Sequence, residues 1–264
     1  MEDRQIVTFL SDFGTLDGYA GSVKGVIKSL APAAEIIDIT HEIAAFDINA
    51  AAFTLMNFYS YYPKDTVHLA VVDPGVGGAR RALIIRTAHH TFVGPDNGIF
   101  KYILSREAYT SYEIDINKIS GGAESSTFHA RDIFAPVVAK LLKGVPMHKL
   151  GRKLDNRTEM PHAFFAKEGG ELAVEPIAID RFGNIITGFS RADLFRLKKE
   201  KITSITTKKF KTSEINRYYT EKEPGELLAL WNSQNYLEIA VCRGSAREIL
   251  DFNPVKDRIY LKFE

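Results

Sequence analysis

Polar loops follow several strand-like segments in the first half of the chain. They are Ser11–Gly14, Thr40–Glu42, Asp73–Gly78 and Gly94–Gly98. Their carboxylate, imidazole and amide groups are types that bind small molecules, and ligands of open α/β sheets bind beyond the carboxyl ends of the strands. Asp, Asn, Gly and Pro are also the ordinary residues of turns, so each loop alone has a purely structural interpretation. Several such loops at one edge of a sheet predict a pocket there.

The loop Asp73–Gly78 is the most informative of these. A carboxylate leaves an apolar strand, Pro74 stiffens the exit, and glycines allow the backbone to approach a ligand closely. Arg80 and Arg81 follow directly. The loop lacks the Lys-Ser/Thr pair of a phosphate-binding P-loop, and no G-x-G-x-x-G motif opens a helix after the first strand. The pattern therefore does not favour a phosphate site of either kind.

Metal and covalent chemistry have little support in the sequence. None of the seven histidines lies in an H-E-x-x-H motif. His129 and Asp132 have a spacing that could place them on one helical face, but Asp132 could equally cap a helix that begins near Ile133. Cys242 lies in a strand-like segment with no identifiable base, and no G-x-S-x-G motif is present. We expect no metal and no nucleophilic serine or cysteine.

Composition narrows the possible partners and location. The 264 residues include 34 basic and 33 acidic side chains, and the net charge of +1 favours neither nucleic acid nor a membrane surface as a partner. No run of 18 apolar residues is present, and the N-terminus does not have the pattern of a signal peptide. A single cysteine excludes an intrachain disulfide. We therefore expect a cytoplasmic protein.

The elements that must position the polar loops alternate between strand-like and helix-like patterns. The strand-like segments are Gln5–Leu10, Glu35–Ile39, Thr66–Val72, Ala82–Arg86 and Thr91–Val93. The helix-like segments are Gly18–Leu30, Asp47–Tyr59, Gly98–Leu104 and Arg131–Leu142. This alternation predicts an α/β N-terminal domain with a central, largely parallel sheet, over residues 1–160.

The second half of the chain has a different pattern. Charged and turn-forming residues fill Gly151–Gly170, which marks the domain boundary. Shorter strand-like segments follow, with a hairpin turn at 231–236 between the last two. They are Leu172–Ile179, Ile185–Gly188, Ile202–Thr206, Glu226–Trp231 and Leu237–Val241. We expect a smaller, mainly β C-terminal domain over residues 170–264.

Six motifs, in order along nearly the whole chain, resemble those of a known family. They are Phe9–Gly14, Val71–Gly77, Gly94–Gly98, Phe128–Pro136, Asp180–Asn184, and Asn232-Ser233 with Glu238. The family is the S-adenosyl-L-methionine (SAM) hydroxide adenosyltransferases, relatives of the bacterial fluorinase and chlorinase. Its architecture, an α/β domain followed by a β domain, agrees with the pattern above.

The resemblance implies roles for particular residues. Asp73, Arg80 and His129 match the acid, guanidinium and imidazole around a reacting water in the hydrolase branch. Asp12 matches the carboxylate that grips the ribose hydroxyls. The remaining positions that match substrate contacts are Asp73 itself, Asp180, Phe182, Asn184, Ser233, Glu238 and Val241. Phe182 would form an aromatic wall, although a buried core position is the usual place for Phe, and Val241 would offer only its backbone.

The chain also departs from the halogenase pattern. In halogenases an Arg follows the serine equivalent to Ser233, whereas Gln234 stands there in this chain. Halogenases replace the acid, guanidinium and imidazole with other residue types, because a carboxylate beside a halide repels it. A non-catalytic sensor of SAM or adenosine is the other alternative, and it has no use for a water-activating cluster.

The activity that the resemblance implies is hydrolysis of SAM. Water attacks the ribose C5′ in line and displaces methionine, giving adenosine and L-methionine. No metal or redox cofactor is required for this step. The resemblance also implies a homotrimer whose pockets lie between the N-terminal domain of one subunit and the C-terminal domain of its neighbour.

Overall fold

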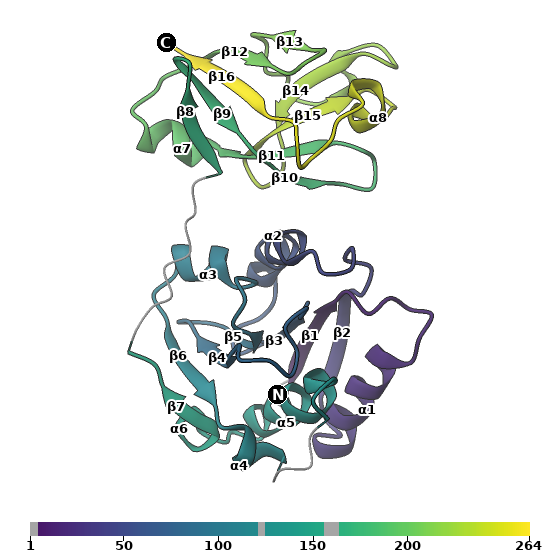
Figure 1. Cartoon of the computed structure of the whole chain (residues 1–264), viewed down its shortest axis with the longest axis vertical. Helices are drawn as coiled ribbons and strands as arrows, with labels where there is room; N and C mark the ends of the chain where they lie inside the picture. Colours follow the sequence, from purple (N-terminus) through teal and green to yellow (C-terminus); the bar gives the residue numbers. More distant parts are fainter. Residues whose placement is uncertain (1–4, 121–124, 156–163) are drawn as a thin grey trace. The chain divides into compact units, whose positions relative to one another are not determined.

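A computed structural model describes residues 5–120, 125–155 and 164–264. Contacts within the chain divide it into two units, Met1–Met160 and Pro161–Glu264. The first unit runs from purple to teal in Figure 1 and the second from green to yellow. Each unit has its own hydrophobic core.

The first unit is built on a seven-stranded sheet. Its strands are β1 (Ile6–Ser11), β2 (Glu35–Thr40), β3 (Val67–Val71), β4 (Ala82–Arg86), β5 (Thr91–Pro95), β6 (Thr110–Ile114) and β7 (Gly151–Lys153). They lie in the order β2-β1-β3-β5-β4-β6-β7. The pairs among β2, β1, β3 and β5 are parallel, and the pairs that involve β4, β6 and β7 are antiparallel. Consequently β4 and β7 run against the other strands, and the predicted largely parallel sheet is confirmed.

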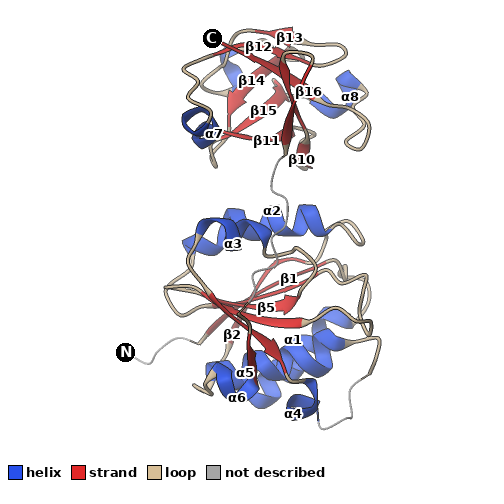
Figure 2. Ribbon diagram, turned by 60° about the vertical axis from the view of Figure 1, so that its left-hand side comes forward, coloured by secondary structure: helices blue, strands red, loops and turns tan. Residues whose placement is uncertain are grey.

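Helices cover both faces of this sheet. The helices are α1 (Tyr19–Leu30), α2 (Ile48–Phe58), α3 (Lys101–Arg106), α4 (Ile116–Ser120), α5 (Ala135–Leu142) and α6 (Met147–Leu150), with short helical turns η1 (Tyr59–Tyr61) and η2 (Ala130–Phe134). Figure 2 shows α2 and α3 on one face and α1 and α5 on the other. Phe9 of β1 packs in the core with α1 and α5, whereas the next residue, Leu10, packs in the core with α2 and α3. Side chains alternate along a strand, so a strand covered on both faces is apolar throughout.

The sequence predicts one helix over Arg131–Leu142, and the structure divides it. Its first turn, η2, is π-helical, and α5 continues from Ala135. Such π-helical turns are rare and frequently occur at functional sites. In this chain the turn directly follows His129.

The second unit contains two antiparallel sheets. Its strands are β8 (Phe165–Glu168), β9 (Glu171–Val174), β10 (Pro176–Ile179), β11 (Ile185–Ser190), β12 (Ile202–Thr206), β13 (Lys211–Thr212), β14 (Leu227–Trp231), β15 (Tyr236–Val241) and β16 (Ile259–Phe263). The sheet orders are β10-β11-β15-β14 and β13-β12-β16-β9-β8. Residues of both sheets share one core, including Val174, Ile259, Ile185 and Ile239. Short helices α7 (Arg191–Arg196), η3 (Tyr219–Glu221) and α8 (Ala246–Leu250) complete the unit. The predicted mainly β character is confirmed.

The prediction of a single strand over Leu172–Ile179 is wrong. The segment splits at Glu175 into β9 and β10, which lie in different sheets. The backbone N–H of Glu175 donates to Phe164, and its carbonyl accepts from Gly188. Pro176 follows and has no N–H to donate, so the ladder of β9 cannot continue through it.

Candidate active site

Asp73, Arg80 and His129 are in direct contact. Nε of Arg80 lies 3.0 Å from each carboxylate oxygen of Asp73, and Nη2 of Arg80 lies 2.5 Å from Oδ2. The same Nη2 lies 2.8 Å from Nδ1 of His129. The side chains of Arg80 and Asp73 are only 10% and 6% exposed, and His129 is buried. The structure therefore brings together the three residues that the sequence predicts.

The contact with Arg80 determines which nitrogen of His129 carries a proton. A guanidinium donates hydrogen bonds and accepts none. Nδ1 of His129 must therefore be the acceptor, and the proton of the neutral ring is on Nε2. His129 thus has a donor, not an acceptor, at its far nitrogen.

A close backbone contact holds the two loops of this cluster together. Gly77 has φ +75°, and a Cβ at this position would lie 2.1 Å from the carbonyl oxygen of Ser126. Only glycine avoids both the strained dihedral and the collision. The loop that carries Asp73 is therefore seated directly on the backbone that leads into His129.

A cavity of about 270 Å³ lies beside the cluster. Its lining includes Asp73 and His129, but not Arg80. Asp12 also lines it, and one oxygen of the Asp12 carboxylate, Oδ2, accepts a 2.9 Å hydrogen bond from the backbone N–H of Phe46. Asp12 follows β1 and Asp73 follows β3. The two strands are parallel neighbours, so their carboxyl ends lie at the same edge of the sheet.

Aromatic side chains that sequence reasoning missed form much of this cavity. They are Phe13, Tyr19, Phe46 and Phe128. Phe13 and Phe128 lie inside two of the quoted motifs, which was the only available signal. Phe46 has φ 68°, a conformation that is unfavourable for a bulky residue and that the sequence did not indicate.

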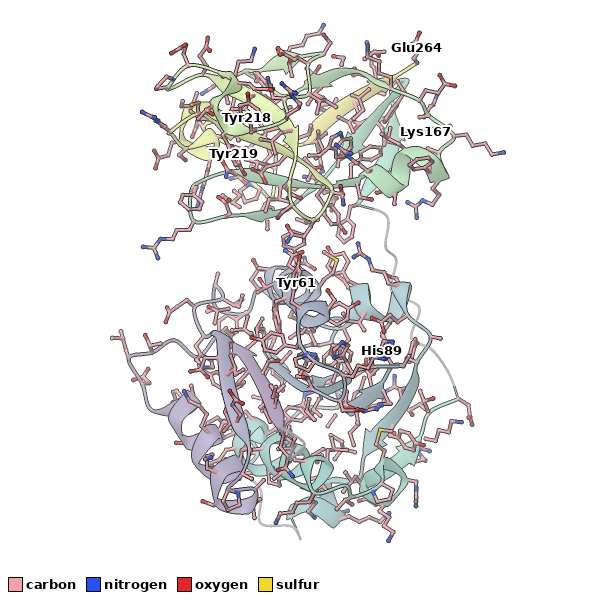
Figure 3. The ribbon with its side chains drawn as sticks, turned by 180° about the vertical axis from the view of Figure 1, so that it is seen from behind. Tyr61, His89, Lys167, Tyr218, Tyr219 and Glu264 are labelled. Carbon is pink, nitrogen blue, oxygen red and sulfur yellow. The ribbon has the colours of Figure 1, made fainter. Side chains whose placement is uncertain are left out.

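The second unit has a pocket of its own, of about 560 Å³. Three predicted substrate-binding residues line it: Asp180, Ser233 and Glu238. Sequence reasoning missed Arg217, Tyr218, Tyr219 and Trp231 of its wall, whereas Asn232 lies in one of the quoted motifs. Tyr218 and Tyr219 are labelled in Figure 3. The pocket is thus rich in aromatic and carboxylate groups.

A buried carboxyl group forms part of this pocket. Glu238 is 2% exposed, and one of its oxygens accepts a 2.8 Å hydrogen bond from the hydroxyl of Tyr219. Burial raises the pKa of Glu238, and it also raises the pKa of the Tyr219 hydroxyl, to which the hydrogen bond with Glu238 adds. Two groups that both resist ionisation therefore face one another here.

Asp180 organises the turn that contains Asn184. One oxygen of Asp180 accepts from the backbone N–H groups of Phe182 and Asn184, and the other accepts from the Asn184 side-chain amide, each at 2.9 Å. Asn184 is buried and Phe182 is 75% exposed. Phe182 is therefore not a core residue, and its ring is accessible to a ligand.

Val241 differs from the other predicted contacts. Its side chain is 3% exposed and lies in the core of the second unit. Only its backbone remains for a substrate contact, and its carbonyl accepts from the N–H of Gly244.

In the part of the chain that the structure describes, no group of three or more His, Cys, Asp and Glu side chains is arranged to hold a metal ion. No helix in those ranges is long and apolar enough to span a bilayer.

Both units match domains of one family. Residues 7–151 match the SAM hydroxide adenosyltransferase N-terminal domain, and residues 175–258 match the SAM hydroxide adenosyltransferase C-terminal domain. The chain belongs to the SAM hydroxide adenosyltransferase family. The resemblance found in the six sequence motifs is therefore confirmed.

Several proteins are similar to this chain over most of its length. A protein of Thermus thermophilus named (R)-S-adenosyl-L-methionine hydrolase is 36% identical and covers 92% of this chain and 94% of its own. One of the same name from Methanocaldococcus jannaschii is 35% identical, over 93% and 92% of the two chains. A crystal structure of an uncharacterized conserved protein from Thermotoga maritima superposes with a TM-score of 0.85, at 32% identity, over 97% and 99% of the chains. A fluorinase from Actinopolyspora mzabensis is more distant, at 26% identity over 72% of this chain and 73% of its own.

Proposed function

We propose that this protein hydrolyses SAM to adenosine and L-methionine by attack of water on the ribose C5′. The observation that carries the proposal is the contact of Asp73 and His129 with Arg80 at the wall of a cavity that Asp12 also lines. The similarity to two proteins named as SAM hydrolases supports the same activity.

The reaction exchanges one bond at C5′ for another. The oxygen of water forms a bond to C5′, and the C5′–S bond breaks with its electron pair moving to sulfur. Methionine leaves as a neutral thioether and needs no acid. The water oxygen becomes positive as its new bond forms, so its proton becomes acidic and passes to a nearby base. Solvent then takes up this proton.

Asp73 is the residue of the cluster that can accept the proton. Arg80 only donates, and Nε2 of His129 already carries a proton because Nδ1 accepts from Arg80. The Nε2–H group donates to the lone pair of the attacking water and fixes its direction. Arg80 does not line the cavity, so its part is to orient Asp73 and His129 and to hold the tautomer. Such preorganisation contributes up to about 7–11 kcal/mol in favourable systems.

Halogenation fits this site less well. A halide at the position of the water would lie beside the Asp73 carboxylate, and the like charges repel one another at short range. The fluorinase relative is also more distant than the two hydrolases. Hydrolysis is the reaction that a carboxylate and an N–H donor favour.

The assembly that we propose is a homotrimer with sites between subunits. The cavity near Asp73 belongs to the first unit and the pocket around Glu238 to the second. Phe46 lines the cavity and is 71% exposed, so an apolar side chain at the cavity is available for a neighbour. Mixed refolding of Asp73→Asn and Glu238→Ala chains should restore activity, because some sites then combine two intact halves. A monomeric mass by light scattering, or no restoration, contradicts the proposal.

We also propose that the reaction needs no metal or cofactor, and that the protein is cytoplasmic. A carboxylate and an imidazole suffice to position and deprotonate water at a sulfonium-activated carbon. The only cysteine, Cys242, is free and buried, which fits a reducing compartment. Turnover that persists after treatment with a chelator supports the first point, and turnover lost to the chelator and restored by a divalent cation overturns it.

The direct test is a product assay with each sulfonium epimer of SAM. In the name of these relatives the prefix L already describes the α-carbon, so (R) describes the sulfur, and we expect the (R) epimer to be consumed. Adenosine and methionine in equal amounts are expected by chromatography. A halogenated nucleoside that depends on added chloride indicates a halogenase instead, and tight binding without turnover indicates a sensor.

A further inference from the structure

A chain of polar side chains begins at the buried Ser11 and His41, beside the loop that carries Asp12, and has no part in the proposed reaction. Oγ of Ser11 lies 2.7 Å from Nδ1 of His41. Nε2 of His41 lies 3.2 Å from Oδ1 of Asp38, whose other oxygen accepts from Nζ of Lys24 at 2.8 Å. Ser11 is 0% exposed and His41 is 5% exposed.

The order Ser-His-Asp is also that of a hydrolytic triad, but the burial of Ser11 excludes this function. A nucleophile must reach a substrate atom, and no atom of Ser11 is accessible. Its Oγ instead accepts a 3.3 Å hydrogen bond from the backbone N–H of Phe13. The chain of contacts therefore acts on the loop that follows β1.

His41 joins that loop to the segment after β2 through two different groups. Its ring contacts Ser11, and its backbone carbonyl accepts a 2.7 Å hydrogen bond from the N–H of Gly14. These two contacts lie on either side of Asp12 in the sequence. Further along the segment after β2, the N–H of Phe46 donates to the Asp12 carboxylate at 2.9 Å. The backbone on both sides of Asp12 is therefore held by one residue.

We propose that His41 is a positioning residue for Asp12. It fixes the loop so that the second oxygen of the Asp12 carboxylate faces the cavity, where it would hold the ribose diol of the substrate. This inference rests on the proposed function. It predicts that loss of the Ser11–His41 hydrogen bond weakens binding of SAM while leaving the chemical step nearly unchanged.

Two substitutions of His41 separate its two side-chain contacts, the hydrogen bond with Ser11 and the 3.2 Å approach to Asp38. In His41→Asn the side-chain amide occupies the position of Nδ1 and keeps the bond to Ser11. In His41→Gln the amide occupies the position of Nε2 and keeps only the contact with Asp38. Ser11→Ala removes the Ser11 bond from the other side. His89→Gln is the control, since His89 lies on an exposed turn of the same unit (Figure 3).

The expected result is a rise in KM for SAM without a matching loss of kcat. His41→Gln and Ser11→Ala should each raise KM about tenfold, which corresponds to about 1.4 kcal/mol, with kcat within about threefold of the wild type. His41→Asn should stay within about threefold in KM, and His89→Gln should be unchanged. Equal KM values in His41→Gln and His41→Asn overturn the proposal, as does a wild-type KM in Ser11→Ala.

Amide hydrogen exchange tests the positioning independently of turnover. The N–H groups of Gly14 and Phe46 should exchange faster in His41→Gln and in Ser11→Ala than in the wild type, with global stability monitored by denaturant unfolding. Unchanged exchange at both amides overturns the inference. If the wild type does not hydrolyse SAM, the proposed function fails, and the exchange rates at Gly14 and Phe46 still decide whether His41 holds the loop.

Discussion

Nη2 of Arg80 lies 2.8 Å from Nδ1 of His129, although the two residues are 49 positions apart in the chain. Because Arg80 can only donate, this bond places the proton of neutral His129 on Nε2. In the proposed mechanism Asp73, which lines the cavity, is then the group of the cluster that accepts the proton. The sequence alone left that question open.

Replacement of Asp73 by Asn should abolish most of the turnover. The amide cannot accept the proton, and Arg80 loses the charge that it faces, so kcat should fall by about 100-fold or more. Asp65→Asn is a matched control, because Asp65 also pairs with a guanidinium, that of Arg86, but precedes β3 and is 75% exposed. Steady-state assays of both variants check this. A kcat for Asp73→Asn within about tenfold of the wild type contradicts the role of Asp73.

The tautomer of His129 can be tested with two amides. His129→Gln presents a donor near the position of Nε2, whereas His129→Asn presents its amide near Nδ1 and leaves the water without a partner. We therefore expect kcat of the Gln variant to exceed that of the Asn variant by about tenfold. This factor corresponds to about 1.4 kcal/mol, the usual contribution of one hydrogen bond to the reacting water. The opposite order would contradict donation from Nε2 of His129 to the reacting water.

The seating of the Asp73 loop predicts the behaviour of two glycines. Gly77→Ala places a Cβ at 2.1 Å from the Ser126 carbonyl, whereas Gly144→Ala meets nothing within 4 Å. The two residues have nearly the same dihedral, φ +75° and +76°, so the intrinsic strain of about 1 kcal/mol is shared. Gly77→Ala should lose about tenfold or more in kcat beyond any loss in Gly144→Ala. Equal activities of the folded variants contradict the close contact.

Buried histidines make the first unit sensitive to acid. Burial, with a smaller contribution from His90, lowers the pKa of His68 to about 3, and burial also lowers the pKa of His90. In the unfolded chain both titrate near 6.5. Below that pH the unfolded chain binds protons that the folded chain does not. The contribution of these histidines to the free energy of unfolding is therefore fully present above pH 6.5 and decreases as the pH falls toward 3.

The expected loss is about 1.4 kcal/mol per pH unit for His68 below pH 6.5, and His90 adds a loss of the same sign. Urea unfolding between pH 7.5 and 4.5 measures it. His68→Asn should reduce this slope by about one histidine's share, whereas His89→Gln should not, because His89 is exposed. A slope that is the same in His68→Asn and in the wild type contradicts the assignment.

Much of the fold could be predicted because its signals are local. The apolar run of β1 and the helical spacing in α1 each indicate their own structure. The ends of parallel strands meet at one edge, so a pocket that includes Asp12 and Asp73 could also be expected. β6, by contrast, has no clear alternation and is mostly half-buried. The split of the predicted strand Leu172–Ile179 into β9 and β10 depends on the backbone hydrogen bonds of Glu175 with Phe164 and Gly188. The local sequence does not indicate these bonds.

The rest of the site depends on tertiary contacts. Nothing in the local sequence of His41 indicates that its ring joins Ser11 to Asp38. The Tyr219 hydroxyl reaches Glu238 from 19 positions away, and no quoted motif contains that tyrosine. The exposure of Phe182 likewise follows from the turn that Asp180 organises. The family resemblance indicated which residues could take part in the reaction. The geometry then indicated which hydrogen bonds each of them can donate or accept.

The most direct test of the account is a crystal structure of the Asp73→Asn variant with (R)-SAM bound. We expect a water molecule between residue 73 and Nε2 of His129, opposite the sulfur and about 3–3.5 Å from C5′. We also expect the ribose hydroxyls at the Asp12 carboxylate. A substrate whose C5′ faces away from His129, or whose ribose contacts another part of the chain, would contradict the central claim.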